Sequence, residues 1–272
     1  TVYLTSASRY VYLSGNAARA VLTPTHESCG HRLQAKSPPT AAAATAAAPR
    51  TGAPPPSLGE LQVEGFLGAG SVGKVFMARR RHPLGDSSGR VSVEEAAVAL
   101  KCEPKTSRGG WSLALSAARA RAALTDGATD HPALPQLVGA FQDGRQLFFV
   151  LELVHGVTLA DTLHEVRRLE PESCATYCAM LAAALAHLHA RDWAHRDVKP
   201  DNVLVDRHGF LHLIDFGNAR RVGEGERAYT LCGTPEYIAP EVLHGSNYDA
   251  SAACWTLGCL LYEMLSGTPP FK

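Results

Sequence analysis

The sequence has no paired cysteine motif, no excess of charge of either sign and no long apolar run. Its 7 cysteines are scattered and include no Cys-x-x-Cys pair, which disfavours a disulfide framework and predicts a reduced, intracellular protein, most simply a cytoplasmic one. The 26 basic residues balance 26 acidic residues, so we expect no binding to nucleic acid and no attraction to an anionic membrane surface. No stretch of about 18 apolar residues is present, so we expect no membrane span.

Residues 1–58 lack the apolar periodicity of a folded segment and are rich in alanine and proline. Such a segment cannot bury enough apolar surface to offset the entropy lost on ordering, so we predict a disordered tail or linker. An organelle transit peptide is the alternative, because the segment is also poor in acidic residues. The chain begins at Thr1 rather than methionine and stops just after an apolar Pro-Pro-Phe sequence, so we expect both ends to be truncated.

From Gly59 onward the patterns are those of a folded protein, and the 272 residues suffice for one large domain or two small ones. Residues 59–154 are rich in strand patterns, whereas residues 155–272 show the longer period of helices. This order predicts an α+β fold in two lobes. Strands are expected within 61–80 (two, joined by a glycine-rich turn), 96–103, 136–141 and 146–154, and helices at 111–124, 173–192 and 251–267.

The glycine-rich turn places Gly68, Gly70 and Gly73 between two strand patterns. A loop that covers phosphates needs its backbone N–H groups close to anionic oxygens, and glycine leaves that approach unblocked. A purely structural glycine hairpin is equally compatible with the pattern. A dinucleotide-binding fold is a further alternative, but its glycine fingerprint opens a helix, whereas a strand pattern follows here.

Lys101 ends the apolar strand pattern Val-Ala-Leu-Lys. An ammonium group at this place could neutralise nucleotide phosphates. A lysine at a strand end is more often a solvated surface charge, so the functional interpretation depends on the glycine-rich turn upstream.

The segment His-Arg-Asp-Val-Lys-Pro-Asp-Asn is far more specific. It offers Asp197 as a potential base, Lys199 as a cation and Asn202 as an amide that can ligate a metal, and Asp215 follows in an Asp-Phe-Gly sequence. Phosphoryl transfer requires mainly positioned groups and screened charge: a carboxylate orients the attacking hydroxyl, a lysine offsets negative charge, and an aspartate with an asparagine holds magnesium. An isolated Asp-Phe-Gly is usually an ordinary turn, but the combination with this loop and with Gly-Thr-Pro-Glu-Tyr-Ile-Ala-Pro-Glu indicates that chemistry.

These motifs resemble the signature set of eukaryotic protein kinases over about Leu61–Lys272. Lys199, which follows His-Arg-Asp-x, is typical of serine/threonine kinases rather than tyrosine kinases. Residues 229–243 and 262–271 closely resemble the cyclic-nucleotide-dependent and related AGC kinases. The resemblance implies a kinase fold whose large lobe is incomplete at its C-terminal end.

The resemblance also implies ATP and Mg²⁺ as cofactors and assigns roles to the motif residues. Asp197 would be the catalytic base, with Lys199 beside it, and Asn202 and Asp215 would bind magnesium. Lys101 would contact the α- and β-phosphates. Implied nucleotide contacts come from the glycine-rich loop, its following strands and the adenine-binding hinge: Gly68, Gly70, Gly73, Val75, Lys101, Glu152 and Val154.

In the activation segment, the resemblance places Thr230 at a phosphorylation site, where Arg196 would pair with the phosphate. Thr234 would bridge the catalytic aspartate and lysine. The sequence shows no cyclic-nucleotide-binding segment, and it identifies no regulatory partner.

Substrate choice can be predicted in part from the same resemblance. Asp201 and Glu263 match acidic residues that capture arginine ahead of the target, whereas a third such position is Thr158. We therefore expect protein substrates with a basic residue near the target and weaker discrimination further away.

Two residues expected from the family have no counterpart. The helix after Lys101 should carry a glutamate that pairs with this lysine, but alignment points to Ala120, and no acid occurs between Glu103 and Asp126. Glu103 lies on the same strand as Lys101 and so cannot couple that strand to the helix. Ala253 replaces an aspartate that hydrogen-bonds the catalytic loop, which leaves loop N–H groups unsatisfied at about 1–3 kcal/mol. The hydrophobic spine is intact by alignment, with Leu124, Leu137, His195 and Phe216.

The leading hypothesis is a serine/threonine kinase that transfers the γ-phosphoryl group of ATP to protein substrates, because the catalytic and ATP-site residues are all kept. A pseudokinase that acts as an ATP-binding or interaction module is the alternative, and the losses at Ala120 and Ala253 favour it. A metabolic kinase is a weaker alternative, because the Gly-Thr-Pro-Glu motif matches kinases with protein substrates.

Overall fold

The computed structural model describes residues 2–4, 10–12, 57–69, 73–85, 91–105, 124, 129–222, 233–245 and 250–271. The predicted disordered segment 1–58 therefore lies almost wholly outside the described residues; within it, β1 (Val2–Leu4) pairs antiparallel with β2 (Tyr10–Tyr12). The predicted helix at 111–124 also lies outside them, except for Leu124. Among the helices that are described, none has the length and apolar character needed to cross a membrane.

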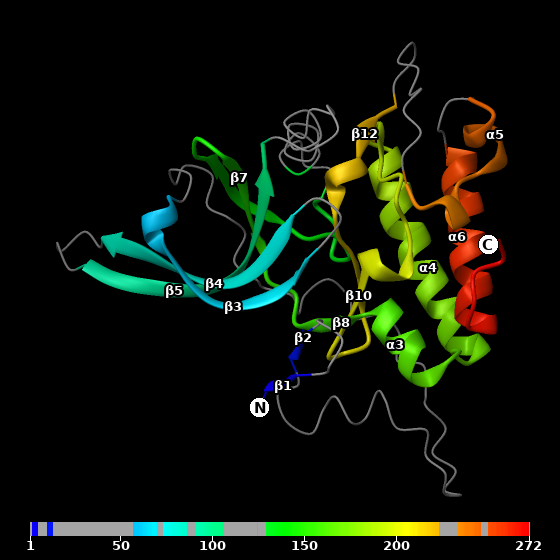
Figure 1. Ribbon diagram of the computed structural model, residues 1–272, viewed down its shortest axis with the longest axis horizontal. Helices are drawn as coiled ribbons and strands as arrows, with labels where there is room; N and C mark the ends of the chain where they lie inside the picture. The colour runs from blue at the N-terminus through cyan, green and yellow to red at the C-terminus, as the bar shows by residue number, and fades with distance from the viewer. Residues whose placement is uncertain are drawn as a thin grey trace, which may run out of the picture.

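Five antiparallel strands form the main sheet, in the order β3-β4-β5-β7-β6 (Figure 1). Side chains alternate between the two faces of each strand. Val98 and Leu100 of β5 are buried on one face together with Phe148 and Val150 of β7. Lys101 points to the opposite face. The strands are β3 (Leu61–Ala69), β4 (Lys74–Gly85), β5 (Val91–Pro104), β6 (Leu137–Gln142) and β7 (Gln146–Glu152), and the 3-10 helix η1 (Leu58–Glu60) precedes them.

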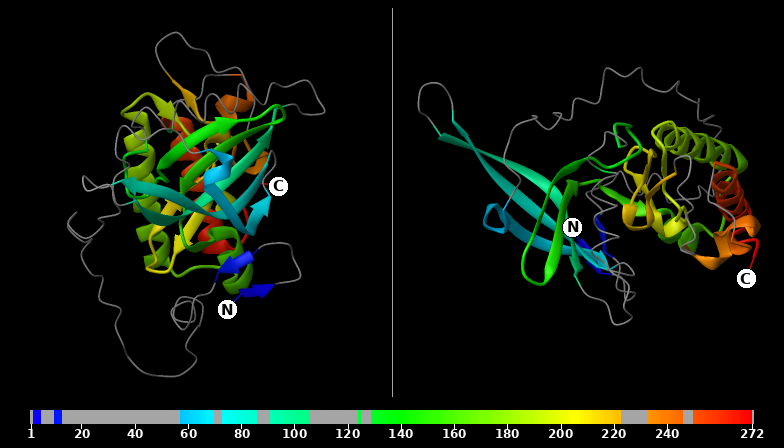
Figure 2. Two further views of the ribbon diagram at one scale, coloured as in Figure 1. Left: turned by 90° about the vertical axis from the view of Figure 1, so that its left-hand side faces the viewer. Right: turned by 90° about the horizontal axis from the view of Figure 1, so that it is seen from above.

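The helical part is built around two long helices, α4 and α6, which lie side by side (Figures 1 and 2). Their apolar faces are buried against each other, with Leu181 and Leu188 of α4 in one core with Leu260 and Met264 of α6. Phe149 of the main sheet belongs to the same core, so the sheet and the helices share buried surface. The helices are α3 (Leu159–Val166), α4 (Pro171–His189), α5 (Pro240–Leu243) and α6 (Ala250–Ser266).

Two small antiparallel sheets lie between the main sheet and the helices. In the first, β10 pairs with both β8 and β11, and in the second, β9 pairs with β12. These pairings bring residues 195–202, which carry the His-Arg-Asp motif, next to residues 214–219, which carry the Asp-Phe-Gly motif. The strands are β8 (Gly156–Thr158), β9 (Trp193–Ala194), β10 (Val203–Asp206), β11 (Leu211–Leu213) and β12 (Arg220–Arg221).

The predicted α+β class is confirmed, with a strand-rich part followed by a helix-rich part (Figure 2). The predicted strands overlap β3 to β7, and the two long predicted helices overlap α4 and α6. The sequence reasoning did not predict β8 and α3, which are short elements that follow each other directly. Thr158 explains where α3 begins, because its hydroxyl oxygen accepts the Asp161 N–H over 3.0 Å.

Candidate active site

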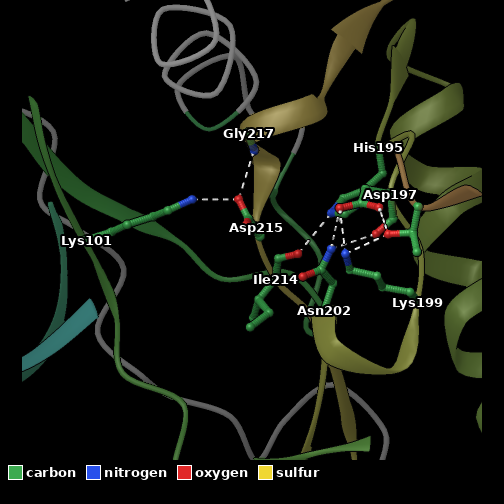
Figure 3. A network of polar contacts seen from close by, with 9 residues as sticks. Lys101, His195, Asp197, Lys199, Asn202, Ile214, Asp215 and Gly217 are labelled. Atoms are coloured by element: carbon green, nitrogen blue, oxygen red, sulfur yellow. Dashed lines mark hydrogen bonds and ion pairs between the residues drawn. The ribbon is translucent and has the colours of Figure 1, made fainter. Parts of the chain in front are cut away.

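The Asp197 carboxylate accepts a hydrogen bond from each of two side chains (Figure 3). Asn202 Nδ2 donates to Asp197 Oδ2 over 2.9 Å, and Thr234 Oγ1 donates to Asp197 Oδ1 over 3.1 Å. Lys199 Nζ donates to Thr234 Oγ1 over 2.7 Å and lies 3.5 Å from Asp197 Oδ2. Pro200 opens the short 3-10 helix η2 (Pro200–Asn202), which turns Asn202 back toward the aspartate. The structure thus brings these predicted residues together, and Thr234 bridges aspartate and lysine as expected.

His195 holds the start of this loop against the Asp-Phe-Gly segment. Its side chain is buried, its Nε2 lies 3.0 Å from the Ile214 carbonyl oxygen, and its ring meets the edge of Phe216 at 5.1 Å between centroids. Burial lowers the pKa of His195 despite nearby carboxylates, so the neutral ring donates through Nε2 to Ile214. Arg196 has φ of +65°, and its Nε donates to the Asn218 carbonyl oxygen over 2.8 Å.

Lys101 and Asp215 form an ion pair between the main sheet and the Asp-Phe-Gly segment (Figure 3). Lys101 Nζ lies 2.6 Å from Asp215 Oδ1, which also accepts the Gly217 N–H over 3.1 Å. Asp215 has φ of +66°, a backbone conformation that is uncommon outside glycine and often occurs at functional sites. Burial raises the pKa of Asp215, but the Lys101 ammonium outweighs this effect and the pKa lies below its usual value. Burial likewise disfavours charged Lys101, yet the carboxylates beside it raise its pKa, so both groups stay charged.

Glu103 is a second partner of Lys101 that the sequence reasoning missed. Its Oε1 lies 2.9 Å from Lys101 Nζ, and its side chain is only 2% exposed. Residues two apart on a strand share a face, so the spacing was a signal that could have revealed the pair. Glu103 contacts the lysine directly, whereas the predicted helix at 111–124 lies outside the described residues except for Leu124.

Gly73, which directly precedes β4, lies against β5. A Cβ atom at Gly73 would lie 2.4 Å from the Cys102 carbonyl oxygen and 3.0 Å from Glu103 Cγ, so this close approach requires glycine. A Cβ atom at Gly68 would meet no described residue within 4 Å, so packing among the described residues does not explain that glycine. Gly70 lies outside the described residues, and a phosphate-binding role for the three glycines stays a prediction.

The other residues expected at the nucleotide lie on neighbouring strands or just beyond them. Val75 of β4 is opposite Lys101 of β5 in the strand register. Glu152 ends β7, where its N–H donates to the Gln136 carbonyl oxygen over 2.9 Å, and Val154 follows half-buried. Their contact with adenine stays a prediction.

A family model for the protein kinase domain matches residues 61–272. The chain belongs to the protein kinase family. It is 34% identical over 215 residues to the cAMP-dependent protein kinase type 3 of Saccharomyces cerevisiae, an alignment that covers 79% of this chain and 50% of the relative. It is 37% identical over 207 residues to protein kinase C of Drosophila melanogaster (76% and 26%) and 36% identical over 212 residues to the cGMP-dependent protein kinase of Toxoplasma gondii (78% and 20%). The chain thus spans half or less of the length of these curated relatives, and the predicted resemblance to AGC-type serine/threonine kinases is confirmed.

Ala253 is buried on α6 within the helical core, where its methyl group provides no hydrogen-bond acceptor. Thr256, one turn further along α6, is a buried polar residue that the sequence reasoning missed. Its hydroxyl lies 3.2 Å from the Tyr237 carbonyl oxygen and 2.9 Å from the Ala252 carbonyl oxygen. Thr256 therefore ties α6 to the 3-10 helix η4 (Pro235–Tyr237), which follows Thr234. The expectations for Ala120 and Thr230 fall outside the described residues.

The four residues expected to form the hydrophobic spine of the kinase lie together. Leu124 and Phe216 are buried in one core, and Leu137 packs against that core. His195 reaches it through its ring contact with Phe216. The spine therefore connects the strand-rich part with the two polar loops.

Acidic side chains lie near Tyr237, which ends the 3-10 helix η4. The Tyr237 hydroxyl donates to the Glu263 carboxylate. Burial raises the pKa of Glu263 against the effect of this hydrogen bond, and the negative charges of Asp201 and Glu236 raise it further. Mutual repulsion of this kind makes the region favourable for a cation. Thr158 has a neutral side chain and so adds no charge to this group. Its hydroxyl caps α3.

Proposed function

We propose that the whole protein is a serine/threonine kinase that transfers the γ-phosphoryl group of ATP to serine or threonine hydroxyls of protein substrates. One observation carries the proposal: the Thr234 hydroxyl oxygen lies 3.1 Å from the carboxylate of Asp197 and 2.7 Å from the ammonium group of Lys199. Kinase relatives matched over most of this chain support the same activity.

In the proposed reaction, Asp197 orients the acceptor hydroxyl and accepts its proton. Each carboxylate oxygen already accepts one hydrogen bond, from Thr234 or from Asn202, which fixes the plane of the group. A carboxylate oxygen has more than one lone pair, so a substrate hydroxyl can still donate to it. Lys199, whose Nζ lies 3.5 Å from Asp197 Oδ2, would offset negative charge on the phosphoryl group that is transferred.

The residues of the site fit Mg²⁺ and ATP. Asp215 supplies a charged carboxylate, and the Asn202 side chain uses its nitrogen for Asp197, so its amide oxygen remains a potential ligand atom. Hard oxygen donors of this kind suit magnesium. Bound magnesium would screen the negative charge of the phosphates. Lys101 would exchange its contact with Asp215 for the α- and β-phosphates.

The substrates we propose carry a basic residue ahead of the target hydroxyl. Asp201, Glu236 and Glu263 interact as a negatively charged group beside the site. An arginine side chain would relieve their repulsion and could bind a carboxylate through two hydrogen bonds. Thr158 is neutral, so we expect weaker selection for basic residues further from the target.

Transfer of labelled phosphate from ATP tests the proposal, with the full-length protein compared with its Asp215→Asn variant. We expect the variant to lose activity by at least about 100-fold, because it removes a charge that the phosphates and their cation need. Asp130→Asn, which neutralises an exposed carboxylate, should leave the rate unchanged. Peptides with arginine ahead of the target should react faster than those with alanine.

Equal incorporation by the wild type and Asp215→Asn would contradict the proposed activity. Stabilisation by Mg-ATP in a thermal shift without any transfer would favour the pseudokinase alternative. Equal rates with arginine and alanine peptides would remove the proposed substrate preference alone.

A further inference from the structure

Glu103 is a buried carboxylate with one partner in the part of the chain that the structure describes. Its Oε1 lies 2.9 Å from Lys101 Nζ, and its Oε2 accepts no hydrogen bond from a described residue. Burying a charge with so few partners costs stability, and apolar residues often replace such pairs without loss of folding. The contacts among the described residues therefore do not explain an acid at this position.

The surroundings of Glu103 direct its carboxylate toward Lys101. Both residues point to the same face of β5, opposite Leu147 and Phe149 of β7 in the strand register. Gly73 lies close beside the Glu103 side chain, since a Cβ atom there would be 3.0 Å from Glu103 Cγ. The side chain is 2% exposed and thus has little room to turn toward solvent.

Lys101 contacts two carboxylates that differ in what else they must do. Asp215 lies 2.6 Å from Lys101 Nζ but comes from another segment, and in the proposed reaction it also holds magnesium. Glu103 is on the same strand as Lys101, so it stays beside the lysine when Asp215 turns to the metal. Glu103 is therefore the partner that can hold the ammonium group in place while phosphates bind.

We propose that Glu103 is a positioning residue that aims Lys101 at the phosphates of a nucleoside di- or triphosphate. The family resemblance led us to expect a glutamate near Ala120 that pairs with Lys101. Glu103 would take over this role. The inference builds on the proposed kinase function, but nucleotide binding can test it without any phosphoryl transfer.

The experiment compares binding of ADP and of adenosine to the full-length protein and to Glu103→Gln, by calorimetry in the presence of EDTA. We expect the ADP affinity to fall about tenfold, as when a charge-assisted contact is weakened, and the adenosine affinity to stay unchanged. The difference between the two ligands isolates the phosphate contact, because a general packing defect would weaken both. In turnover assays kcat should fall as well.

Glu95→Gln is the matched control, because Glu95 is also on β5 but is exposed and pairs with Arg79 and Arg81. It should leave both affinities unchanged. Glu103→Leu is the second variant, which removes the carboxylate with an apolar side chain suited to burial. It should show the same loss, specific to ADP, even if Glu103→Gln folds poorly.

Unchanged or higher ADP affinity in the Glu103 variants would overturn the inference, even with an active enzyme. Loss of ADP affinity in these variants, together with no phosphoryl transfer by the wild type, would support the inference and contradict the proposed function. A wild type that binds neither ligand would overturn both.

Discussion

At the residue scale, one hydroxyl group links the two proposed catalytic side chains through hydrogen bonds. Thr234 Oγ1 accepts from Lys199 and donates to Asp197, so the positions of the proposed base and the proposed cation depend on one atom. Asn202 holds the second oxygen of Asp197 independently, over 2.9 Å. The aspartate should therefore stay in the site without Thr234, but less well ordered.

Replacing Thr234 with alanine should lower kcat about 10- to 100-fold, because Asp197 and Lys199 each lose a hydrogen bond. Thr234→Ser keeps the hydroxyl and should retain most of the activity. Initial rates at saturating ATP measure both variants. An alanine variant as active as the serine variant would show that the bridge is dispensable.

At the element scale, β5 organises the nucleotide side of the site. It carries Lys101 and Glu103 on one face, and its Cys102 carbonyl group lies against Gly73 of the glycine-rich turn. The position of Gly73 is therefore set by contact with the strand that bears the lysine. Gly68, near the end of β3, has no such contact with a described residue within 4 Å.

The two glycines should respond differently to alanine. Gly73→Ala should lower the free energy of unfolding by about 1–3 kcal/mol, because the added methyl group forces the turn and β5 apart. Gly68→Ala should leave stability unchanged, since the added group meets no described residue within 4 Å. Urea unfolding followed by circular dichroism compares the two variants, and equal losses would contradict the contact between Gly73 and β5.

At the scale of the whole molecule, charged and titratable groups are buried between the main sheet and the helices. Burial keeps the pKa of His195 below its ordinary value of 6.5. Lys101 keeps the pKa of Asp215 below its ordinary value of 3.8, although burial acts in the opposite direction. Both shifts favour the deprotonated group in the folded protein, so protons bind more tightly to the unfolded chain.

The free energy of unfolding should therefore decrease as the pH falls below 6.5, the ordinary pKa of histidine. His195 contributes at most about 1.4 kcal/mol per pH unit between 6.5 and its lower folded pKa, and Asp215 adds a further loss below 3.8. Urea unfolding at a series of pH values measures this slope.

His195→Phe should make the free energy of unfolding depend less steeply on pH below 6.5. A weaker slope should remain, because burial and the neighbouring His187 also lower the pKa of His131. The same slope in the wild type and His195→Phe would contradict the buried, neutral state of His195.

Much of the site could be predicted because its residues occur in contiguous motifs. Asp197, Lys199 and Asn202 lie within one loop, so their spacing alone limits how far apart they can be. Thr256 could not be predicted in this way, because its partner, the Tyr237 carbonyl group, belongs to a distant segment. The roles of Gly70 and Thr230, the domain limits and a cytoplasmic location stay predictions.

The sequence by itself determined the α+β class, the kinase family and the motif residues, because strand and helix periods and loop spacings are local properties of the chain. Only the tertiary structure decided which charges meet. Lys101 lies between Asp215 and Glu103 because β5 is buried against the loop that follows β11 and because one face of β5 carries both Lys101 and Glu103. The spacing of Lys101 and Glu103 shows only that they share a face of a strand, whereas the burial of that face and the approach of Asp215 depend on packing across the whole fold.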